Sequence, residues 1–284
     1  MKIAKVYDNF KDFASLFRCP ICKSNMGFQN GASLVCENRH CFDLSKTGYI
    51  NLLQKQVKTP YSKELFESRR RVFSAGFYDK IIDKLEEIIA KHVANKEVTL
   101  LDAGCGEGFF TTQLTKDSDG KRHVFAVDIE KDAVIMAARQ APLVKCFVGD
   151  LANLPLQANA IDVILNIFSP ACYEEFGRVI KGNGIVVKVV PQKNYLLELR
   201  NSAKGQLSRD EYSNVQVLAL FEENMDVLEV QRVTYTLPLL ESQLADFIAM
   251  TPMMFNVDKE SMDLEAITEI TIDVDVLVGK LRNS

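Results

Sequence analysis

Short apolar segments recur along the chain from about residue 79 onward. Between residues 79 and 93 the apolar side chains fall on one stripe at helical spacing, which predicts an amphipathic helix; they are Ile81, Ile82, Leu85, Ile88 and Ile89. Compact apolar runs then predict buried strands at 98–104, 123–128, 144–150, 161–168 and 184–190. Helical candidates lie between several of these strands. The alternation favours an α/β fold with a parallel, doubly wound sheet and helices on both faces.

Other parts of the chain have different patterns. Residues 270–279 alternate strictly between apolar and polar side chains, which predicts a half-exposed antiparallel strand. Residues 15–60 hold a cluster of cysteines and short β-like pieces, and residues 61–78 form a charged connector with arginines at 69–71. The pattern therefore predicts a large α/β domain preceded by a small, differently built segment.

The first predicted strand ends in a glycine-rich turn, LLDAGCGEGFF. Gly104, Gly106 and Gly108 follow Asp102 at every second position, and glycines there let a ligand approach the backbone closely. A nicotinamide site requires a third glycine where this chain has Phe109, and a P-loop requires Gly-Lys-Ser/Thr, which is absent from the turn. The acidic-x-G-x-G-x-G pattern instead resembles motif I of the class I S-adenosylmethionine methyltransferases.

The next two strands strengthen that resemblance. Asp128 ends the second strand, where a carboxylate can accept hydrogen bonds from both ribose hydroxyls. Asp150 ends the third, and with Leu151 it lies where the adenine is expected. The resemblance implies that these residues and the three glycines bind S-adenosylmethionine, with Asp102 acting structurally or holding the methionine end through its surroundings. The competing interpretation is the same fold with a different or lost ligand.

The composition is that of an ordinary globular protein. The chain has 284 residues, of which 47% are apolar and 25% charged, so it can bury a large core. The sequence has neither an apolar run long enough to cross a membrane nor a signal-peptide pattern at its start. We therefore expect a cytoplasmic protein with no membrane partner. Clustered cysteines in a reducing compartment favour metal binding, whereas isolated ones are typical of core residues.

The N-terminal cysteines have the spacing of a structural zinc site. Cys19 and Cys22 form one knuckle, and after thirteen intervening residues Cys36 begins a second, completed by His40 or by Cys41. Four such ligands make a closed tetrahedral site, which is structural rather than catalytic, and a segment this short needs a metal because it cannot build an adequate core. The spacing alone leaves His40 and Cys41 as alternatives.

The order of motifs along nearly the whole chain resembles the RlmA family of bacterial, zinc-containing 23S rRNA guanine-N1 methyltransferases. The matching pieces are CPIC at 19–22, CENRH at 36–40, FD at 42–43, GYINLL at 48–53, RRVFSAGFY at 70–78 and FSPACYEEFGRVIKGNGIVV at 168–187. An MTPMMF segment at 250–255 also matches, although no tryptophan follows it as in the family. Phe255 stands there instead, and we expect it to be a core residue.

This resemblance implies a domain organisation and an activity. Residues 1–60 are expected to form a zinc-binding RNA-recognition domain, 61–78 a basic connector, and 79–284 the S-adenosylmethionine-dependent methyltransferase domain. The zinc ligands would be Cys19, Cys22, Cys36 and His40. The enzyme would methylate N1 of a guanine in a 23S rRNA hairpin loop, at rRNA position 745 or 748. One branch of the family contributes to macrolide resistance, and the sequence does not assign this chain to a branch.

The distribution of charge is consistent with an RNA partner. Residues 1–100 carry six more basic than acidic side chains, and residues 101–284 carry ten more acidic ones. An anionic partner would be attracted to the N-terminal third. As a group, the candidates for phosphate contacts are Lys23, Arg39, Lys46, Lys55, Lys58 and the arginines at 69–71.

Methylation at N1 of guanine requires loss of the N1 proton and donors for the charge that develops on O6. The NIFSP loop after the fourth strand is expected to face the methyl group. Asn166 and Ser169 are candidates to hydrogen-bond the base edge, and Pro170 to shape the turn. The sequence identifies no general base. Cys172 is expected to be structural, because the cysteine nucleophile of pyrimidine methyltransferases follows proline directly.

Two other functions are consistent with the sequence. One is a small-molecule methyltransferase whose zinc serves stability alone, against which the basic N-terminal third argues. The other is a nucleic-acid-binding protein that senses the cofactor without turnover, against which the intact acidic and glycine positions argue. The sequence leaves the oligomeric state open, including a homodimer.

Overall fold

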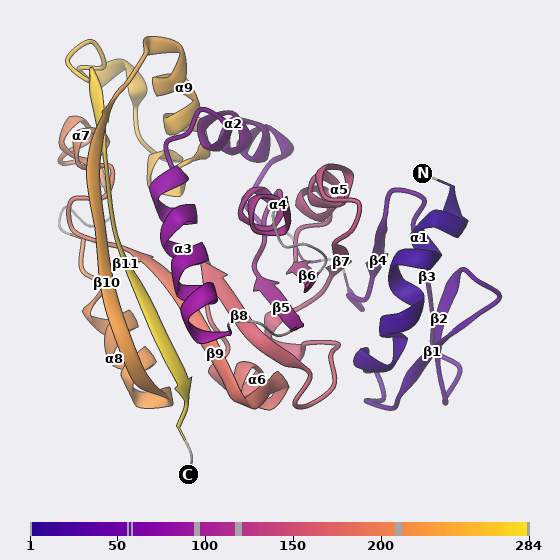
Figure 1. The fold of residues 1–284 in the computed structure, drawn as a ribbon. Helices are drawn as coiled ribbons and strands as arrows, with labels where there is room; N and C mark the ends of the chain where they lie inside the picture. The colour runs from indigo at the N-terminus through magenta and orange to yellow at the C-terminus, as the bar shows by residue number, and fades with distance from the viewer. Residues whose placement is uncertain are drawn as a thin grey trace.

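An eight-stranded mixed sheet runs through the centre of the computed structural model, which describes residues 2–55, 57, 59–93, 97–116, 121–207 and 212–282 (Figure 1). The strand order is β10-β11-β9-β8-β5-β6-β7-β4. In chain order the strands are β4 (Tyr49–Asn51), β5 (Val98–Ala103), β6 (Arg122–Asp128), β7 (Lys145–Val148), β8 (Ile161–Ile167), β9 (Ile180–Pro191), β10 (Met225–Pro238) and β11 (Glu269–Leu281).

Six neighbouring strands, from β4 to β9, are parallel, while β11 and β10 are antiparallel to their neighbours. The central strands are almost wholly buried, because helices cover both of their faces. The strand order reverses beside β5, and ligands of such sheets bind beyond the carboxyl ends of the strands at this point. The predicted α/β class and all five predicted parallel strands are confirmed.

Helices and turns form a layer on each side of the sheet. The first layer packs in the larger core and consists of α2 (Lys63–Ser74), α3 (Asp79–His92), α4 (Phe109–Lys116), α5 (Lys131–Gln140), α7 (Leu197–Ser202) and α9 (Glu241–Met250). The second core lies beneath α1 (Ile3–Phe10), α6 (Tyr173–Val179) and α8 (Val215–Asn224). Short 3₁₀ turns lie at η1 (Lys11–Leu16), η2 (Leu151–Asn153), η3 (Pro252–Met254) and η4 (Lys259–Ser261).

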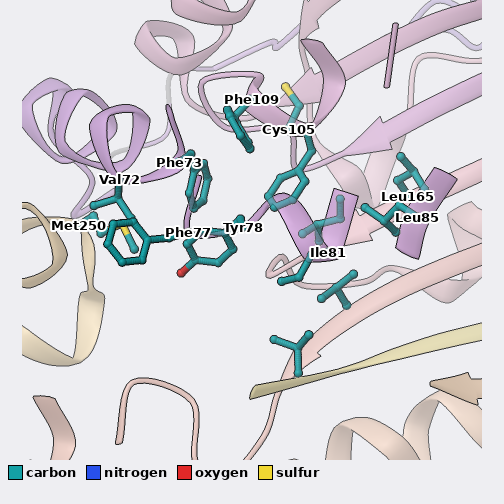
Figure 2. Close-up of a cluster of buried hydrophobic side chains, with 14 of the residues drawn as sticks. Val72, Phe73, Phe77, Tyr78, Ile81, Leu85, Cys105, Phe109, Leu165 and Met250 are labelled. Atoms are coloured by element: carbon teal, nitrogen blue, oxygen red, sulfur yellow. The ribbon is translucent and has the colours of Figure 1, made fainter. Parts of the chain in front are cut away.

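The predicted amphipathic helix is α3, and four of its five stripe residues are buried. Its start joins α2 through an aromatic cluster that includes Phe73, Phe77 and Tyr78 (Figure 2). Cys105 of the glycine loop and Met250 of α9 belong to the same core. The packing therefore fixes α2 and α9 relative to the glycine loop.

The segment before residue 61 shares the core of the larger domain. Its strands β1 (Met26–Gln29), β2 (Ser33–Cys36) and β3 (Cys41–Asp43) form a small antiparallel sheet, whereas β4 pairs with β7 in the main sheet. Phe17 lies fully buried with its ring 5.8 Å from that of Phe125 and 5.7 Å from that of Phe147. The division at residue 60 stays a prediction about folding units.

The expectation of a half-exposed strand at 270–279 is wrong. The strand, β11, is antiparallel and lies between β9 and β10, and its polar residues Asp273 and Asp275 are buried. Arg232 of β10 donates two hydrogen bonds to Asp273, of 2.8 and 2.7 Å, and Gln192 donates to Asp275. Alternation of apolar and polar residues usually indicates a strand with one solvent-exposed face. In β11 the polar residues instead form hydrogen bonds with side chains of neighbouring segments.

Candidate active site and metal centre

A cavity of about 1020 Å³ opens beyond the carboxyl ends of β5, β6, β8 and β9. Its walls come from the glycine loop after β5, the loop after β8, and side chains of α2, α8 and α9. The cavity contains Asp102, Gly104 and Gly106 together with Asp128, and Asp150 and Leu151 also line it. The structure thus brings the sequence-predicted cofactor residues to one place, with Gly108 just outside the lining.

Each glycine of the loop has a backbone conformation with positive φ: +87° at Gly104, +54° at Gly106 and +81° at Gly108. A Cβ atom at Gly104 would lie 2.0 Å from Oγ of Ser169, so this glycine lets the loop after β8 approach. A Cβ at Gly108 would lie 2.6 Å from that of Ala137. Gly108 therefore serves the packing of α4 against α5, whereas Gly106 leaves its backbone facing the cavity.

The acidic residues at the strand ends are already partly hydrogen-bonded. Asp128 accepts from the backbone N–H groups of Gly106 and Glu130, at 2.8 and 2.9 Å, one at each carboxylate oxygen. Desolvation raises its pKa, and these bonds oppose that rise. Asp102 is buried, accepts from the Thr111 hydroxyl, and has a pKa raised by burial to about 7. Asp128 keeps acceptor capacity toward the cavity, while Asp102 supports the loop from beneath.

The third acidic position begins the turn after β7. Asp150 accepts a hydrogen bond of 2.9 Å from the backbone N–H of Ala152 and so caps η2. Leu151, at the start of that turn, offers an apolar side chain to the cavity. A glycine cradle, a strand-end carboxylate and an apolar wall suit an adenosine with a polar tail, so the donor set fits S-adenosylmethionine.

The three arginines of α2 have three different environments. Arg69 lines the cavity, and its Nη1 lies 3.5 Å from a Cβ built at Gly106. Burial raises the pKa values of Glu107 and Asp128, and the positive charge of Arg69 opposes that rise. Arg71 forms an ion pair with Asp246 of α9, and Arg70 is exposed. RNA contact by this group stays a prediction, within which Arg69 faces the glycine loop and Arg71 joins α2 to α9.

The other predicted phosphate contacts are dispersed. Lys23 donates to the backbone oxygen of Pro20 and to Asn153, whereas Arg39 and Lys55 are exposed. Lys46 has a partner within the protein. Lys58 lies outside the described residues.

The N-terminal segment gathers four metal-binding side chains. The ligand atoms of Cys19, Cys22, Cys36 and His40 all lie within 4.8 Å of one another. The sulfur atoms of Cys22 and Cys36 are 3.6 Å apart, and His40 Nδ1 lies 3.5 and 3.4 Å from those of Cys19 and Cys36. Tetrahedral zinc bonds imply edges of about 3.6–3.8 Å, so the set fits one zinc ion. Cys41 is exposed and outside this group.

The first zinc knuckle rests on the cofactor side of the large domain. The Pro20 carbonyl accepts hydrogen bonds from Asn153 of η2, at 3.1 Å, and from Gln54, at 2.8 Å. The backbone N–H of Arg18 donates to the carbonyl of Pro155 at 3.1 Å. The knuckle therefore supports the turn that carries Asp150 and Leu151.

The loop after β8 is held from within by a lysine that sequence reasoning missed. Asn166 is fully buried, and its amide donates to the carbonyls of Ala103 and Pro170, at 2.9 and 3.0 Å. Lys188 of β9 donates to Asn166 Oδ1 and to the Ser169 carbonyl. Asn166 thus has no free edge for a base, contrary to expectation, while Ser169 and Pro170 line the cavity.

Aromatic side chains surround the predicted substrate side. Phe168, at φ +52°, lies 5.5 Å from Tyr195 with their rings tilted by 32°, and both line the cavity. Phe255 is 40% exposed and makes an edge contact with Tyr61 at the cavity rim, so the expectation that it is a core residue is wrong. The neighbouring Met254 is buried in its place.

Comparisons with known proteins cover both parts of the chain. Residues 17–61 match the N-terminal zinc ribbon of RlmA, and residues 100–184 match a methyltransferase domain. YxjB of Bacillus subtilis, named as a candidate 23S rRNA (guanine-N1)-methyltransferase, is 38% identical over 273 residues, covering 93% of this chain and 97% of its own. The 23S rRNA (guanine(748)-N1)-methyltransferase of Streptomyces fradiae is 26% identical, covering 93% and 96%.

Solved structures share the fold. One chain of the complex between the Haloferax volcanii Trm112 methyltransferase activator and a methyltransferase superposes with a TM-score of 0.50 at 17% identity, covering 80% of this chain and all of that one. Within the described residues, every helix is too short or too polar to cross a membrane.

Proposed function

Because the chain belongs to the family of RlmA-type 23S rRNA (guanine-N1)-methyltransferases, we propose that it transfers a methyl group from S-adenosylmethionine to N1 of a guanine in a 23S rRNA hairpin loop. The observation that carries this proposal is the span of the similarity to YxjB, which covers 93% of the chain and so includes both the zinc ribbon and the methyltransferase domain. An rRNA substrate implies a reaction in the cytoplasm.

The cofactor would lie along the glycine loop. S-adenosylmethionine supplies an activated methyl group, so the protein has mainly to align the nucleophile and exclude water. Gly104 and Gly106 give the close backbone approach, Asp128 would accept from the ribose hydroxyls, and Asp150 with Leu151 would hold the adenine. Arg69 adds a cation beside Gly106 that suits the carboxylate of the methionine portion.

The loop after β8 would position the guanine. Ser169 and Pro170 line the cavity and are the members of the predicted set that can reach the base. Phe168 and Tyr195 provide aromatic faces, and proteins commonly stack single-stranded RNA bases on such faces. Asn166 would act through this loop by fixing its shape.

RNA binding would use the rim of the cavity and the N-terminal segment. Arg39, Lys55 and Arg70 are exposed cations that can contact phosphates, and Tyr61 with Phe255 forms an exposed aromatic pair at the rim. A structural zinc at Cys19, Cys22, Cys36 and His40 would keep the small sheet rigid. A homodimer stays a prediction, which the molecular mass in solution tests.

The experiment is methyl transfer from radiolabelled S-adenosylmethionine to unmodified 23S rRNA transcript, followed by nucleoside analysis. We expect label in 1-methylguanosine, and reverse transcription stops would locate it at position 745 or 748. Label in another nucleoside, or in small molecules alone, would contradict the proposal. Cofactor binding without any transfer, to transcript or to ribosomal assembly particles, would favour a cofactor-sensing RNA-binding protein.

A further inference from the structure

Lys188 is a buried lysine at the carboxyl end of β9 that lines the cavity and is only 4% exposed. Its Nζ donates one hydrogen bond to Asn166 Oδ1 and a second, of 3.0 Å, to the carbonyl oxygen of Ser169. Burial lowers the pKa of Lys188 to about 8. None of the described carboxylates lies where its negative charge would raise this pKa again. A substantial fraction of this side chain is therefore a neutral amine near pH 8.

The two acceptors leave one position of the amine free. A neutral primary amine has two N–H groups and one lone pair, and here both N–H groups have fixed acceptors. The lone pair is the remaining position when the amine is neutral, and a third N–H takes that position when it is charged. Lys188 lines the cavity beside the loop expected to face the guanine, which puts this residue on the substrate side.

The carboxylates of the cavity have other partners. Asp102 accepts from Thr111, Asp128 accepts from two backbone N–H groups, and Asp150 caps η2. Glu107 is buried at the glycine loop, where the charge of Arg69 opposes the rise in its pKa that burial causes. These four groups belong to the cofactor side, which leaves Lys188 as the basic group on the substrate side.

We propose that Lys188 takes the N1 proton of the target guanine, an inference that rests on the proposed function. The N1–H bond breaks and its proton passes to Nζ of Lys188, giving an ammonium. The electron pair left on N1 forms the new N1–CH₃ bond as the methyl carbon separates from sulfur, and the S–C bonding pair stays on that sulfur. The ammonium then releases the proton to water.

A second buried group supports a polar ligand in this cavity. Tyr173 is 8% exposed and lines the cavity, and its hydroxyl lacks a hydrogen-bond partner among the described residues. Burial raises the pKa of Tyr173 to about 12, so the hydroxyl stays protonated at neutral pH. An unsatisfied buried donor is costly, and guanine O6, which gains negative charge as N1 loses its proton, is a suitable acceptor.

Other titratable groups around Lys188 prevent a pH profile alone from testing the proposal. Burial raises the pKa values of both Asp102 and Glu107 to about 7, so either would add an inflection near neutral pH. On the neighbouring strand β11, Gln192 holds Asp275 and Arg232 holds Asp273. Tyr195 has a pKa raised to about 12, and desolvation also raises that of Tyr212. The decisive test must therefore address the amine itself.

The test is chemical rescue of Lys188→Ala in single-turnover assays on rRNA transcript. We expect this variant to slow 1-methylguanosine formation by about 100-fold or more, the usual contribution of a general base. The affinity for S-adenosylmethionine, measured by calorimetry, should stay within about twofold of the wild type. Small primary amines should restore part of the rate, more so at pH values where they are neutral.

Lys188→Arg and Lys188→Met are the companion variants. Arginine keeps a donor and a positive charge but does not give up a proton, so it should be as slow as methionine if Lys188 is the base. Recovery of most of the rate with arginine, or the lack of any rescue by amines, would overturn the proposal in favour of a positioning role. A Lys188→Ala rate within fivefold of the wild type would also overturn it.

A readout independent of turnover is the rate at which an acylating reagent modifies Lys188 in the absence of RNA. Mass spectrometry measures this rate at several pH values. Its pH midpoint should lie near 8, against about 10.4 for ordinary lysines. A midpoint near the ordinary value would contradict the proposal. If the wild-type protein makes no 1-methylguanosine at all, the proposed function fails, whereas wild-type activity without dependence on Lys188 rejects this inference alone.

Discussion

At the residue scale, Asp128 connects the glycine loop to the cavity proposed to hold the cofactor. Its carboxylate holds the backbone N–H groups of Gly106 and Glu130 and still faces the cavity. A carboxylate fixed in this way is oriented before any ligand arrives, so little further ordering is needed on binding. The same side chain therefore shapes the loop and, in the proposed function, would bind the ribose.

Asp128→Ala should weaken S-adenosylmethionine binding by about 10- to 100-fold, because hydrogen bonds to a charged group contribute about 1.5–3 kcal/mol. Isothermal titration calorimetry measures the change. Asp132→Ala is the matched control, since Asp132 is an exposed acid on the next helix, α5, and should leave the affinity unchanged. Equal affinities for the wild type and Asp128→Ala would contradict the assignment.

The ionisation of Asp102, beneath the glycine loop, should make the stability of the protein depend on pH. Burial raises its pKa to about 7 from an ordinary 3.8, so the folded state binds this proton more tightly than the unfolded chain. The resulting stability is complete below about pH 4 and is lost as the pH rises through 7.

Asp102→Asn removes this titration while keeping an acceptor for Thr111. The free energy of unfolding of the variant should therefore fall less between pH 6 and 8 than that of the wild type. Urea denaturation at several pH values measures the slopes. Asp83→Asn, on the exposed side of α3, should keep the wild-type slope. Parallel curves for Asp102→Asn and the wild type would show that Asp102 is already ionised in the folded protein.

At the scale of elements, the zinc knuckle and the turn η2 form one supported unit. The Pro20 carbonyl accepts from Asn153, and Lys23 donates to the same side chain. A structural metal contributes directly to the folding of its segment, so its loss releases the knuckle. Asp150 and Leu151, which line the cavity and are proposed to bind the cofactor, would then lose the support that Asn153 gives to their turn.

Cys22→Ser should lower the zinc content of the purified protein and weaken S-adenosylmethionine binding several-fold. Metal analysis and calorimetry on the same samples measure both effects. Cys41→Ser is the control: it changes an exposed thiol outside the ligand group and should retain one zinc ion per chain. His40→Ala should resemble Cys22→Ser, and the reverse ranking of His40 and Cys41 variants would make Cys41 the fourth ligand.

At the scale of the whole molecule, the N-terminal segment and the large domain share one sheet and one core. Strand β4 extends the main sheet beside β7, and Phe10 with Phe17 lies in the core beneath its second face. The boundary at residue 60 stays a prediction, and side chains from both sides of it pack in one core. Deleting residues 1–60 would expose the apolar face that these side chains cover.

Phe17→Ala should destabilise the whole protein by about 3–5 kcal/mol, the usual cost of removing a fully buried phenylalanine. Because Phe17 contacts Phe125 and Phe147 of the main sheet, we expect one unfolding transition that shifts as a unit. Urea denaturation followed by far-UV circular dichroism measures it. Leu143→Ala, at a position 77% exposed, is the control. A shift confined to a separate early transition would support independent folding of residues 1–60.

Local signals explain what was predictable. The parallel strands, helix α3 and the glycine loop were predicted from residues within a few positions of one another. The spacing also predicted three cysteine ligands, whereas His40 in preference to Cys41 followed from the family resemblance and agrees with the observed cluster. Strand β10 was missed, although its alternating segment EVQRVTYTL carried a usable signal. The connector was described by its charge, and its capping residue Ser62 followed by a buried stripe would have indicated helix α2.

The sequence by itself determined the chemistry available: zinc ligands at knuckle spacing, a glycine turn after a strand, and acids at strand ends. Only the tertiary structure decided which residues meet. Successive residues of a helix point about 100° apart, so Arg69, Arg70 and Arg71 face the cavity, solvent and α9 despite being neighbours. Lys188 lies 22 residues beyond Asn166 and reaches it because β8 and β9 are paired, and no local pattern specifies such a contact.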